Sequence, residues 1–360
     1  PQETDELMAI MRQLAANGTS IIFITHKLRE VQAVADRIVV IRLGKVVGEA
    51  KPTSSASELA SMMVGREVHL SVDRAPLKKG DVVLSVDQIS VRDDRGQLAV
   101  NDLSLELHAG EVLAIAGVQG NGQTELAEAI VGLRKLEKGS GKIVYKGKSV
   151  ESLSVRERLE DFLSYVPEDR KKDGLVSEFN IEENLMLNQS YEDDRGAKFV
   201  RRGLLDQAAL KSEAEQAIER FDIRTQGSKS LAGKLSGGNQ QKVIIGRWLD
   251  VGSNVLVFDE PTAGIDIPSK LEIYRTLRRL ADEGAAVVVC STDFQEIGLV
   301  SDRVLVLRDG RVVGLVERGA AGAEGETRML LEDGLRIFEV LGLGRDVGAT
   351  EFPLLLAGLG

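Results

Sequence analysis

The sequence predicts an α/β protein in which helices cover both faces of a parallel sheet. Apolar runs without alternation recur along the chain, and segments with helical periodicity separate them. Residues 1–48 also align without gaps to residues 267–314, and ten of the nineteen positions between 30 and 48 are identical to their counterparts. Such a repeat predicts two copies of one structural unit in tandem.

Both copies predict the same series of elements. In each, an amphipathic helix ends at a glycine, Gly18 or Gly284, and an apolar strand, a short helix and a second strand follow. A hairpin turn at Gly44 or Gly310 then closes the series. The helices are expected at 4–16 and 270–283, the first strands at 21–25 and 287–291, and the second strands at 38–41 and 304–307.

The repeat divides the chain into segments. Residues 1–70 match only the C-terminal part of a copy and residues 81–317 match a whole one, so we expect a tandem duplication that lacks its front part. Residues 71–80 form a linker rich in lysine, proline and glycine. A charged stretch of about 168–250 predicts a helical subdomain, and the glycine-rich tail, 318–360, has no role that we can assign.

Composition excludes several classes of protein. The 360 residues include 43% hydrophobic and 28% charged residues, which is enough to build a packed core. The formal net charge of −10 argues against a nucleic-acid partner. Cys290 is the single cysteine, which excludes a disulfide scaffold and a cysteine-based zinc site. Since no run of about 18 apolar residues occurs, we expect no membrane span.

A glycine-rich turn stands between an apolar strand, 112–116, and a helix-like segment, 125–131. Its spacing is that of the P-loop, in which backbone N–H groups and a helix N-terminus surround phosphates, but a glutamine stands where that pattern has lysine. The residues alone also allow a plain glycine turn. The candidate nucleotide-binding residues are Gly117, Gly120, Asn121, Gly122, Gln123 and Thr124, of which Thr124 is also a candidate Mg²⁺ ligand.

Two adjacent carboxylates follow the apolar run 255–258. A buried parallel strand that ends in Asp259 and Glu260 directs both acids to the edge of the sheet where ligands bind. We expect Asp259 to bind Mg²⁺, directly or through water, and Glu260 to polarise an attacking water. The alternative is a pair of acids that begins a helix, which Pro261 also fits.

A third candidate motif opens a helix that is expected to run to about residue 249. Ser236 is a suitable N-cap residue, and Gly237 and Gly238 allow a backbone or an anion to approach closely. Asn239 and Gln240 follow them. On chemistry alone, this motif is equally an ordinary capped helix.

Together, these motifs resemble the ATP-binding subunit of ABC transporters. Residues 235–240 resemble the signature motif of that family, residues 255–260 its Walker B motif, and residues 263–266, which end in Asp266, its D-loop. Residues 164–168 resemble the Q-loop, with Glu168 in place of glutamine. The resemblance implies a P-loop NTPase-type nucleotide-binding domain at 81–317, with a β-rich lobe and a helical subdomain, preceded at 1–70 by the end of a first such domain.

The resemblance also implies two unequal ATP sites between paired domains. His26 matches the switch histidine of the first domain, while its counterpart in the second copy is Thr292. We therefore expect one efficient site that uses His26 as a catalytic residue together with Ser236, Gly237 and Gly238. A slower site would combine Gln123, Thr124, Asp259, Glu260 and Thr292. The chain alone is expected to hydrolyse ATP poorly.

The extended signature in a tandem subunit is similar to that of simple-sugar and nucleoside importers. The P-loop is more similar to that of the nucleoside branch, so we expect nucleoside import, with sugar import as the alternative. The implied ligands are ATP and Mg²⁺. The implied partners are membrane permease subunits, a paired nucleotide-binding domain and, indirectly, an extracytoplasmic substrate-binding protein.

This resemblance also places the chain at the cytoplasmic face of the membrane as a peripheral subunit. Two other classes stay open. One is an ABC ATPase that works without a permease, and the other is a pseudo-ATPase fragment that only binds nucleotide.

Overall fold

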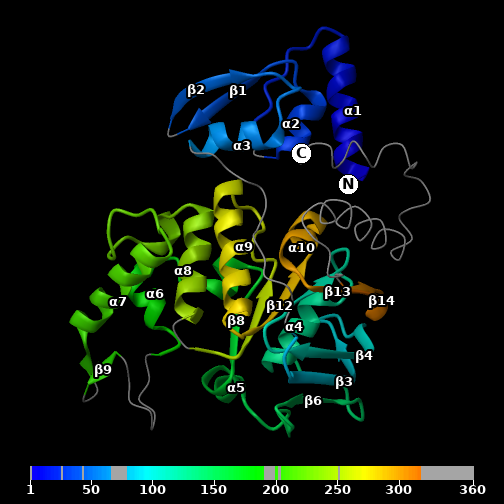
Figure 1. Cartoon of the computed structure of the whole chain (residues 1–360), viewed down its shortest axis with the longest axis vertical. Coiled ribbons are helices and arrows are strands. Elements are labelled where there is room, and N and C mark those ends of the chain that lie inside the picture. Colours follow the sequence, from blue (N-terminus) through cyan, green and yellow to red (C-terminus); the bar gives the residue numbers. More distant parts are fainter. Residues whose placement is uncertain are drawn as a thin grey trace. The chain divides into compact units, whose positions relative to one another are not determined.

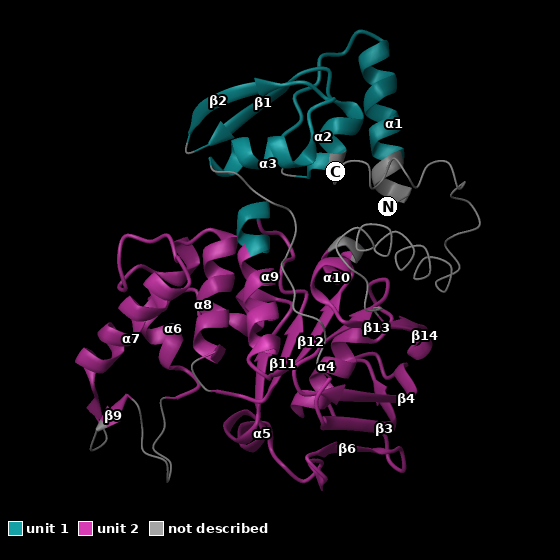
Figure 2. Cartoon of the chain, in the orientation of Figure 1, with its two compact units in different colours: residues 1–72, 266–271, 345–360 teal, residues 73–265, 272–344 magenta. Residues whose placement is uncertain are grey.

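The fold comes from a computed structural model, which describes residues 2–25, 27–42, 44–65, 79–189, 199–201, 204–249 and 252–317. The chain divides into two compact units, shown in Figure 2. Unit 1 contains residues 1–72, 266–271 and 345–360, and unit 2 contains residues 73–265 and 272–344. His26, most of the expected linker and the expected tail lie outside the described residues. None of the described helices is both long and apolar enough to cross a membrane.

Unit 1 is built from three helices and a β-hairpin in its described N-terminal part. The elements are α1 (Gln2–Ala16), α2 (Leu28–Val34), β1 (Ile38–Arg42), β2 (Lys45–Ala50) and α3 (Ala56–Val64). Ser55 caps α3 by accepting a hydrogen bond from the backbone N–H of Glu58, and Gly65 ends it in a left-handed conformation. Ile38, Val40 and Leu59 are the buried residues of its small apolar cluster.

The structure repeats the pattern that the sequence repeats. Helices α1 and α2 correspond to α9 (Ile267–Asp282) and α10 (Phe294–Val300) in the second copy. In the alignment of the two copies, the last residues of α1 and α2, Ala16 and Val34, match the last residues of α9 and α10. In the hairpin β1–β2, Ile38 pairs with Ala50, and in the second copy Val304 pairs with Val316. Both hairpins shift register at the equivalent step, after Val40 and after Val306. The same side-chain pattern therefore produces the same hairpin twice.

One expected strand is absent. Residues 21–25 were expected to form a strand like 287–291, but the structure describes them as irregular, whereas β12 (Ala286–Ser291) forms as expected. Strand β12 lies between two parallel neighbours, while no strand pairs with 21–25 in the described part of the chain. The side chains of Ile22 and Ile24 are 93% and 91% exposed. The apolar run alone did not suffice, because a strand needs a partner for its backbone hydrogen bonds.

Two sheets form the centre of unit 2. The six-stranded sheet has the order β14–β13–β5–β12–β11–β8 and is parallel except for β14. Its strands are β5 (Val112–Ala116), β8 (Leu163–Val166), β11 (Val255–Asp259), β12, β13 (Arg303–Arg308) and β14 (Arg311–Glu317). The antiparallel sheet has the order β4–β3–β6–β7, from β3 (Val82–Arg92), β4 (Leu98–His108), β6 (Lys142–Tyr145) and β7 (Lys148–Ser149).

Helix α4 (Gln123–Val131) packs between these two sheets, as Figure 1 shows. Its buried residues join the main apolar core, to which both sheets contribute. Helices α8 (Gly237–Leu249) and α9 lie on the other side of the six-stranded sheet, which is thus covered on both faces (Figure 1). The continuous burial of β5, β11 and β12 fits this arrangement and the α/β prediction.

A helical subdomain follows β8. It contains the short turn η1 (Arg170–Gly174), α6 (Ile181–Met186), β9 (Val200–Arg201), β10 (Leu204–Leu205), α7 (Gln207–Arg220), η2 (Ala232–Lys234) and α8. Helix α6 packs against both α7 and α8. Helix α5 (Val155–Asp161) precedes β8, outside this group. The expected combination of a β-rich lobe with a helical subdomain is confirmed.

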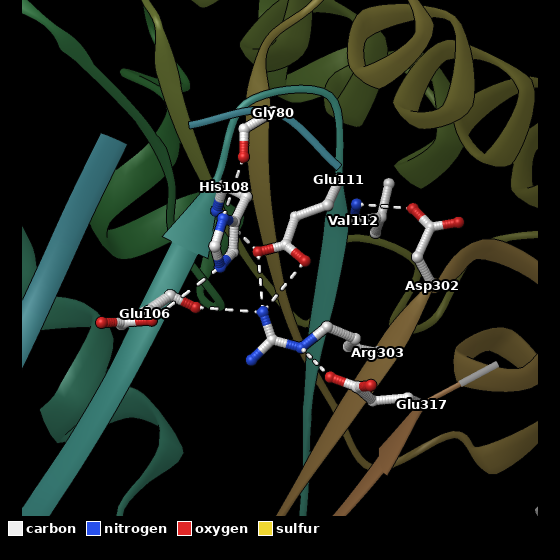
Figure 3. A network of polar contacts seen from close by, with 8 residues as sticks. All are labelled: Gly80, Glu106, His108, Glu111, Val112, Asp302, Arg303 and Glu317. Carbon is white, nitrogen blue, oxygen red and sulfur yellow. Dashed lines mark hydrogen bonds and ion pairs between the residues drawn. The ribbon is translucent and has the colours of Figure 1, made fainter. Parts of the chain in front are cut away.

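A buried ion pair fastens the amino ends of β5 and β13, as Figure 3 shows. Glu111 is fully buried and accepts hydrogen bonds from Arg303 Nη1 at 3.0 and 3.1 Å and from the backbone N–H of His108 at 2.6 Å. Beside it, Asp302 accepts from the backbone N–H of Val112 at 2.8 Å. These contacts hold the two strands in register at the edge of the sheet opposite their carboxyl ends.

Candidate functional site

Four parallel strands end side by side and bring the predicted motifs together. Across neighbouring strands, Ala116 at the end of β5 pairs with Ser291 of β12, Cys290 pairs with Asp259 of β11, and Phe258 pairs with Val166 of β8. The glycine turn, Thr292, Glu260 and Glu168 follow these four ends. Ligands bind at such an edge in open α/β sheets, so the topology itself forms a candidate site.

The glycine turn after β5 has two glycines in the left-handed conformation and leads directly into a helix. Gly120 and Gly122 have φ of 87° and 100°, in the region that side chains disfavour. A Cβ on Gly122 would lie 2.2 Å from the carbonyl oxygen of Ala99, so no other residue fits there without a shift. Asn121 fixes the turn from outside, because its Oδ1 accepts from the backbone N–H of Asp309 at 2.8 Å. Helix α4 then begins at Gln123 and presents its N-terminus to the site.

Gln123 lies folded over this turn. Its side chain is buried, and Nε2 donates to the carbonyl oxygen of Val118 at 3.3 Å. A Cβ on Gly117 would lie 2.4 Å from the same nitrogen, so Gly117 leaves the space that Gln123 occupies. The residue can donate a hydrogen bond to a phosphate oxygen, but it supplies no positive charge.

Asp259 is the most deeply buried acid of the site. Only 1% of it is exposed, and within the described residues its Oδ2 has no hydrogen-bond partner. Burial raises the pKa of Asp259 to about 7, the charges of Glu168 and Glu260 act in the same direction, and the hydrogen bond of Thr124 opposes them. An unpartnered carboxylate oxygen at this depth fits a group that is completed by a cation.

Thr124 links Asp259 to Glu168. The Thr124 hydroxyl donates to Glu168 Oε2 at 3.4 Å and also interacts with Asp259. A hydroxyl and a carboxylate are ligands that suit Mg²⁺, which uses few protein oxygens and takes the rest from water and substrate phosphates. The described residues contain no group of three or more His, Cys, Asp or Glu side chains that could hold a metal by themselves. The residues present therefore fit Mg²⁺ that enters with a phosphate ligand.

Glu260 is held in an unusual conformation. Its φ of 45° is in the left-handed region, and such strain is concentrated at functional sites. Glu260 Oε1 accepts from the backbone N–H of Thr292 at 2.6 Å. Burial raises the pKa of Glu260, while the hydrogen bonds from Thr292 lower it. Alignment of the two copies identified Thr292 as the counterpart of His26, but it could not predict that Thr292 contacts Glu260.

The third motif forms the start of α8. The backbone N–H of Gln240 donates to the carbonyl oxygen of Ser236 at 2.9 Å, as at a helix N-terminus. The Ser236 hydroxyl accepts from the Asn239 side chain at 2.8 Å rather than from a backbone N–H, which differs from the expected side-chain cap. Gly237 and Gly238 are the first residues of the helix. Gln240 is buried and donates to the carbonyl oxygen of Ala232 at 3.1 Å.

The predicted site residues thus fall into separate groups. Gly117, Gly120, Asn121, Gly122, Gln123, Thr124, Glu168, Asp259 and Glu260 gather at the carboxyl edge of the sheet. No hydrogen bond within the described chain joins residues 236–240 to this group. Asp266 Oδ1 accepts from the backbone N–H of Ser269 in the first turn of α9. His26 is outside the described residues.

Comparison with known proteins agrees with the geometry. Residues 100–263 match the family model described as ABC transporter. The chain is 43% identical over 317 residues to a nucleoside import ATP-binding protein, NupA, of Lactococcus lactis subsp. cremoris, covering 88% of the chain and 62% of that protein. It is 39% identical over 330 residues to a ribose import ATP-binding protein, RbsA 1, of Streptomyces avermitilis, covering 92% of the chain and 60% of that protein. The chain therefore spans about three fifths of the length of these relatives.

A solved structure shows the same fold. The dimeric ATP-binding cassette MJ0796, bound to ADP and Pi, superposes with a TM-score of 0.56 at 22% identity, covering 66% of this chain and 99% of that one. The fold, the family model and the curated relatives agree with the motifs at the sheet edge. The chain contains an ATP-binding domain of the ABC transporter family, homologous to ATP-binding proteins of nucleoside and ribose import.

Proposed function

We propose that this chain is part of an ATP-binding subunit that couples ATP binding and hydrolysis to the import of a nucleoside through a membrane permease. The convergence of the glycine turn, Asp259, Glu260 and Glu168 at one sheet edge carries the proposal. The two relatives, a nucleoside import and a ribose import ATP-binding protein, support the substrate class.

The residues divide the chemistry between them. The backbone N–H groups of the 117–124 turn and the N-terminus of α4 bind the phosphates. Thr124 and Asp259 would hold Mg²⁺, which supplies charge neutralisation at the phosphates. Glu260 orients the attacking water and accepts its proton, and burial raises its pKa, which makes the carboxylate a stronger base.

A second domain of the same kind completes each ATP site. We place residues 1–70 as the C-terminal part of a first nucleotide-binding domain, residues 71–80 as a linker and residues 81–317 as the second domain. The matching register of the two hairpins supports this division. Ser236, Gly237, Gly238, Asn239 and Gln240 would then face a nucleotide held by the first domain, with Asp266 at the seam.

The two sites differ in rate in this proposal. The site with His26 hydrolyses ATP efficiently. The site with Gln123 and Thr292 is slower, because Gln123 lacks charge and the Thr292 side chain offers no imidazole. The experiment compares Glu260→Gln with the equivalent change in the first domain of the full-length subunit. A larger loss of ATPase activity from the first-domain change supports the asymmetry, and equal losses contradict it.

The motion on ATP binding is passed to the permease. The segment after β8 and the helical subdomain, about 168–250, are the proposed route, and the permease would dock near residues 168–180. The subunit would be bound peripherally at the cytoplasmic face of the membrane, and an extracytoplasmic binding protein would deliver the solute.

Uptake into proteoliposomes tests the function and the substrate together. The full-length subunit, assembled with its permease and binding protein, should import radiolabelled guanosine in the presence of internal ATP and Mg²⁺. Guanosine is chosen as the nucleoside because the chain is also 42% identical over 318 residues to a guanosine import ATP-binding protein of Bacillus subtilis. Ribose is the alternative substrate, and ribose uptake without guanosine uptake would replace the nucleoside assignment. The importer class would be contradicted if the subunit co-purified with ribosomes and hydrolysed ATP without a permease.

A further inference from the structure

Arg170 connects three segments that are far apart in the sequence. Its Nη1 donates to the carbonyl oxygen of Ala263, in the turn after β11. Its Nη2 lies 3.2 Å from the place that a Cβ on Gly237 would occupy, and 3.7 Å from that place on Gly264. The guanidinium therefore fills a space that two glycines leave open, between the first turn of α8 and the turn after β11.

Asp169 holds the backbone around Arg170 in a turn by accepting hydrogen bonds. Asp169 Oδ1 accepts from the backbone N–H groups of Lys171 at 2.9 Å and Lys172 at 3.1 Å, and its carbonyl oxygen accepts from Asp173. Arg170 thus stands at the start of a hydrogen-bonded turn, two residues after Glu168. The backbone that carries Arg170 is therefore held by hydrogen bonds within this turn.

The Ala263 carbonyl belongs to the same tight turn as Glu260. The backbone N–H of Ala263 donates to the carbonyl oxygen of Glu260 at 3.2 Å. The Arg170 guanidinium is partly buried, which lowers its pKa, and its Nε has no hydrogen-bond partner within the described residues. A partly desolvated cation that makes one backbone contact adds little to the free energy of folding. The main effect of Arg170 is therefore to fix the relative positions of the segments that it contacts.

We propose that Arg170 is a positioning residue that joins the segment of Glu168 to the turn of Glu260 and to the start of α8, so that the three move together when nucleotide binds. This inference rests on the proposed function. A displacement of the segment after β8 reaches Glu260 through two hydrogen bonds, Arg170 to Ala263 and Ala263 to Glu260. Arginine suits the role because its planar group reaches two segments at once, which a lysine ammonium does not.

Hydrogen exchange on the chain tests the connection without nucleotide. Arg170→Gln should raise the exchange of the hydrogen-bonded amides of Ala263 and Gln240 about tenfold, the loss expected for one charge-assisted hydrogen bond. Arg170→Lys, which keeps the charge, should give an intermediate increase. Lys172→Gln is the matched control, because it removes the same charge from an exposed side chain of the same turn. Unchanged exchange in a folded Arg170→Gln variant would overturn the proposal.

Adding ATP and Mg²⁺ separates this proposal from the proposed function. In the wild type, nucleotide should protect the 117–124 turn together with the amide of Ala263, while in Arg170→Gln it should protect only the 117–124 turn. If nucleotide protects neither segment in the wild type, the proposed function is wrong. The exchange measured without nucleotide would still show whether Arg170 connects the segments. In the assembled transporter, Arg170→Gln should lower kcat about tenfold and leave the KM for ATP within about twofold. The kcat is calculated per folded, nucleotide-binding molecule, so that a general loss of stability does not lower it.

Discussion

Gln123 leaves the glycine turn without a positive charge. Its amide already donates to the Val118 carbonyl oxygen, so it must exchange that contact for a phosphate oxygen when a nucleotide binds. Residue types and spacing predicted this position, but they could not show that the side chain lies folded over the turn. That information depends on Gly117, whose missing Cβ leaves the space.

Restoring the charge should strengthen nucleotide binding. Gln123→Lys should lower the Kd for ATP with Mg²⁺ about five- to tenfold, because a hydrogen bond from a charged donor is stronger than one from an amide. Titration with a fluorescent ATP analogue measures the change. Gln216→Lys, which adds the same charge on an exposed face of α7, is the control. Equal affinities for Gln123→Lys and wild type would contradict the account.

The buried carboxyl of Asp259 should make stability depend on pH. Its folded pKa of about 7 is raised above an unfolded value of about 3.9, so the unfolded chain loses this proton at lower pH than the folded chain does. The free energy of unfolding therefore falls as pH rises from about 4 to 7, and this contribution is constant above that range.

Asp259→Asn should remove that dependence. Denaturant unfolding in metal-free buffer should show the variant gaining stability over wild type as pH rises from about 4 to 7, by a few kcal/mol at the most, at about 1.4 kcal/mol per pKa unit. Asp87→Asn, on an exposed part of β3, is the control. Parallel pH curves for Asp259→Asn and wild type would show that the buried acid has an ordinary pKa.

At the scale of elements, the sequence predicted most strands and helices but not the partners they require. The repeat correctly predicted β12, β13 and the two hairpins, since their apolar patterns coincide with available neighbours. The same reasoning was wrong for residues 21–25, which have the apolar pattern but no hydrogen-bonded neighbouring strand among the described residues. The contact between Glu260 and Thr292 was missed for a related reason, because it depends on how β11 and β12 align.

The repeat also offers a matched test of the ion pair between Glu111 and Arg303. Arg303→Leu should lower the free energy of unfolding by about 3–5 kcal/mol, because it leaves a buried carboxylate without its partner. Arg37→Leu, the equivalent change in the first copy, should cost under about 0.5 kcal/mol, since Arg37 and Glu49 form an exposed pair.

Chemical denaturation measures both changes. The double variant Glu111→Leu/Arg303→Leu should be more stable than Arg303→Leu alone, because it removes the unpaired charge as well. Equal losses from the two arginine changes would show that burial of the second pair has no energetic consequence.

For the whole molecule, the family was predictable because several motifs share one order and one sheet edge. The relation between the segment of Glu168, the turn of Glu260 and the start of α8 was not, since Arg170 meets residues more than sixty positions away. Such a contact follows from the packed fold and leaves no periodic signal in the sequence. In the function that we propose, the whole subunit also needs a paired domain and a permease.

A structure of the chain with ATP and Mg²⁺ tests the central claim most directly. The account predicts the triphosphate against the backbone of Gly120 and Gly122, with Mg²⁺ beside Thr124 and Asp259. Nucleotide bound elsewhere, or a turn left empty at saturating ATP in the presence of the paired domain, would contradict it.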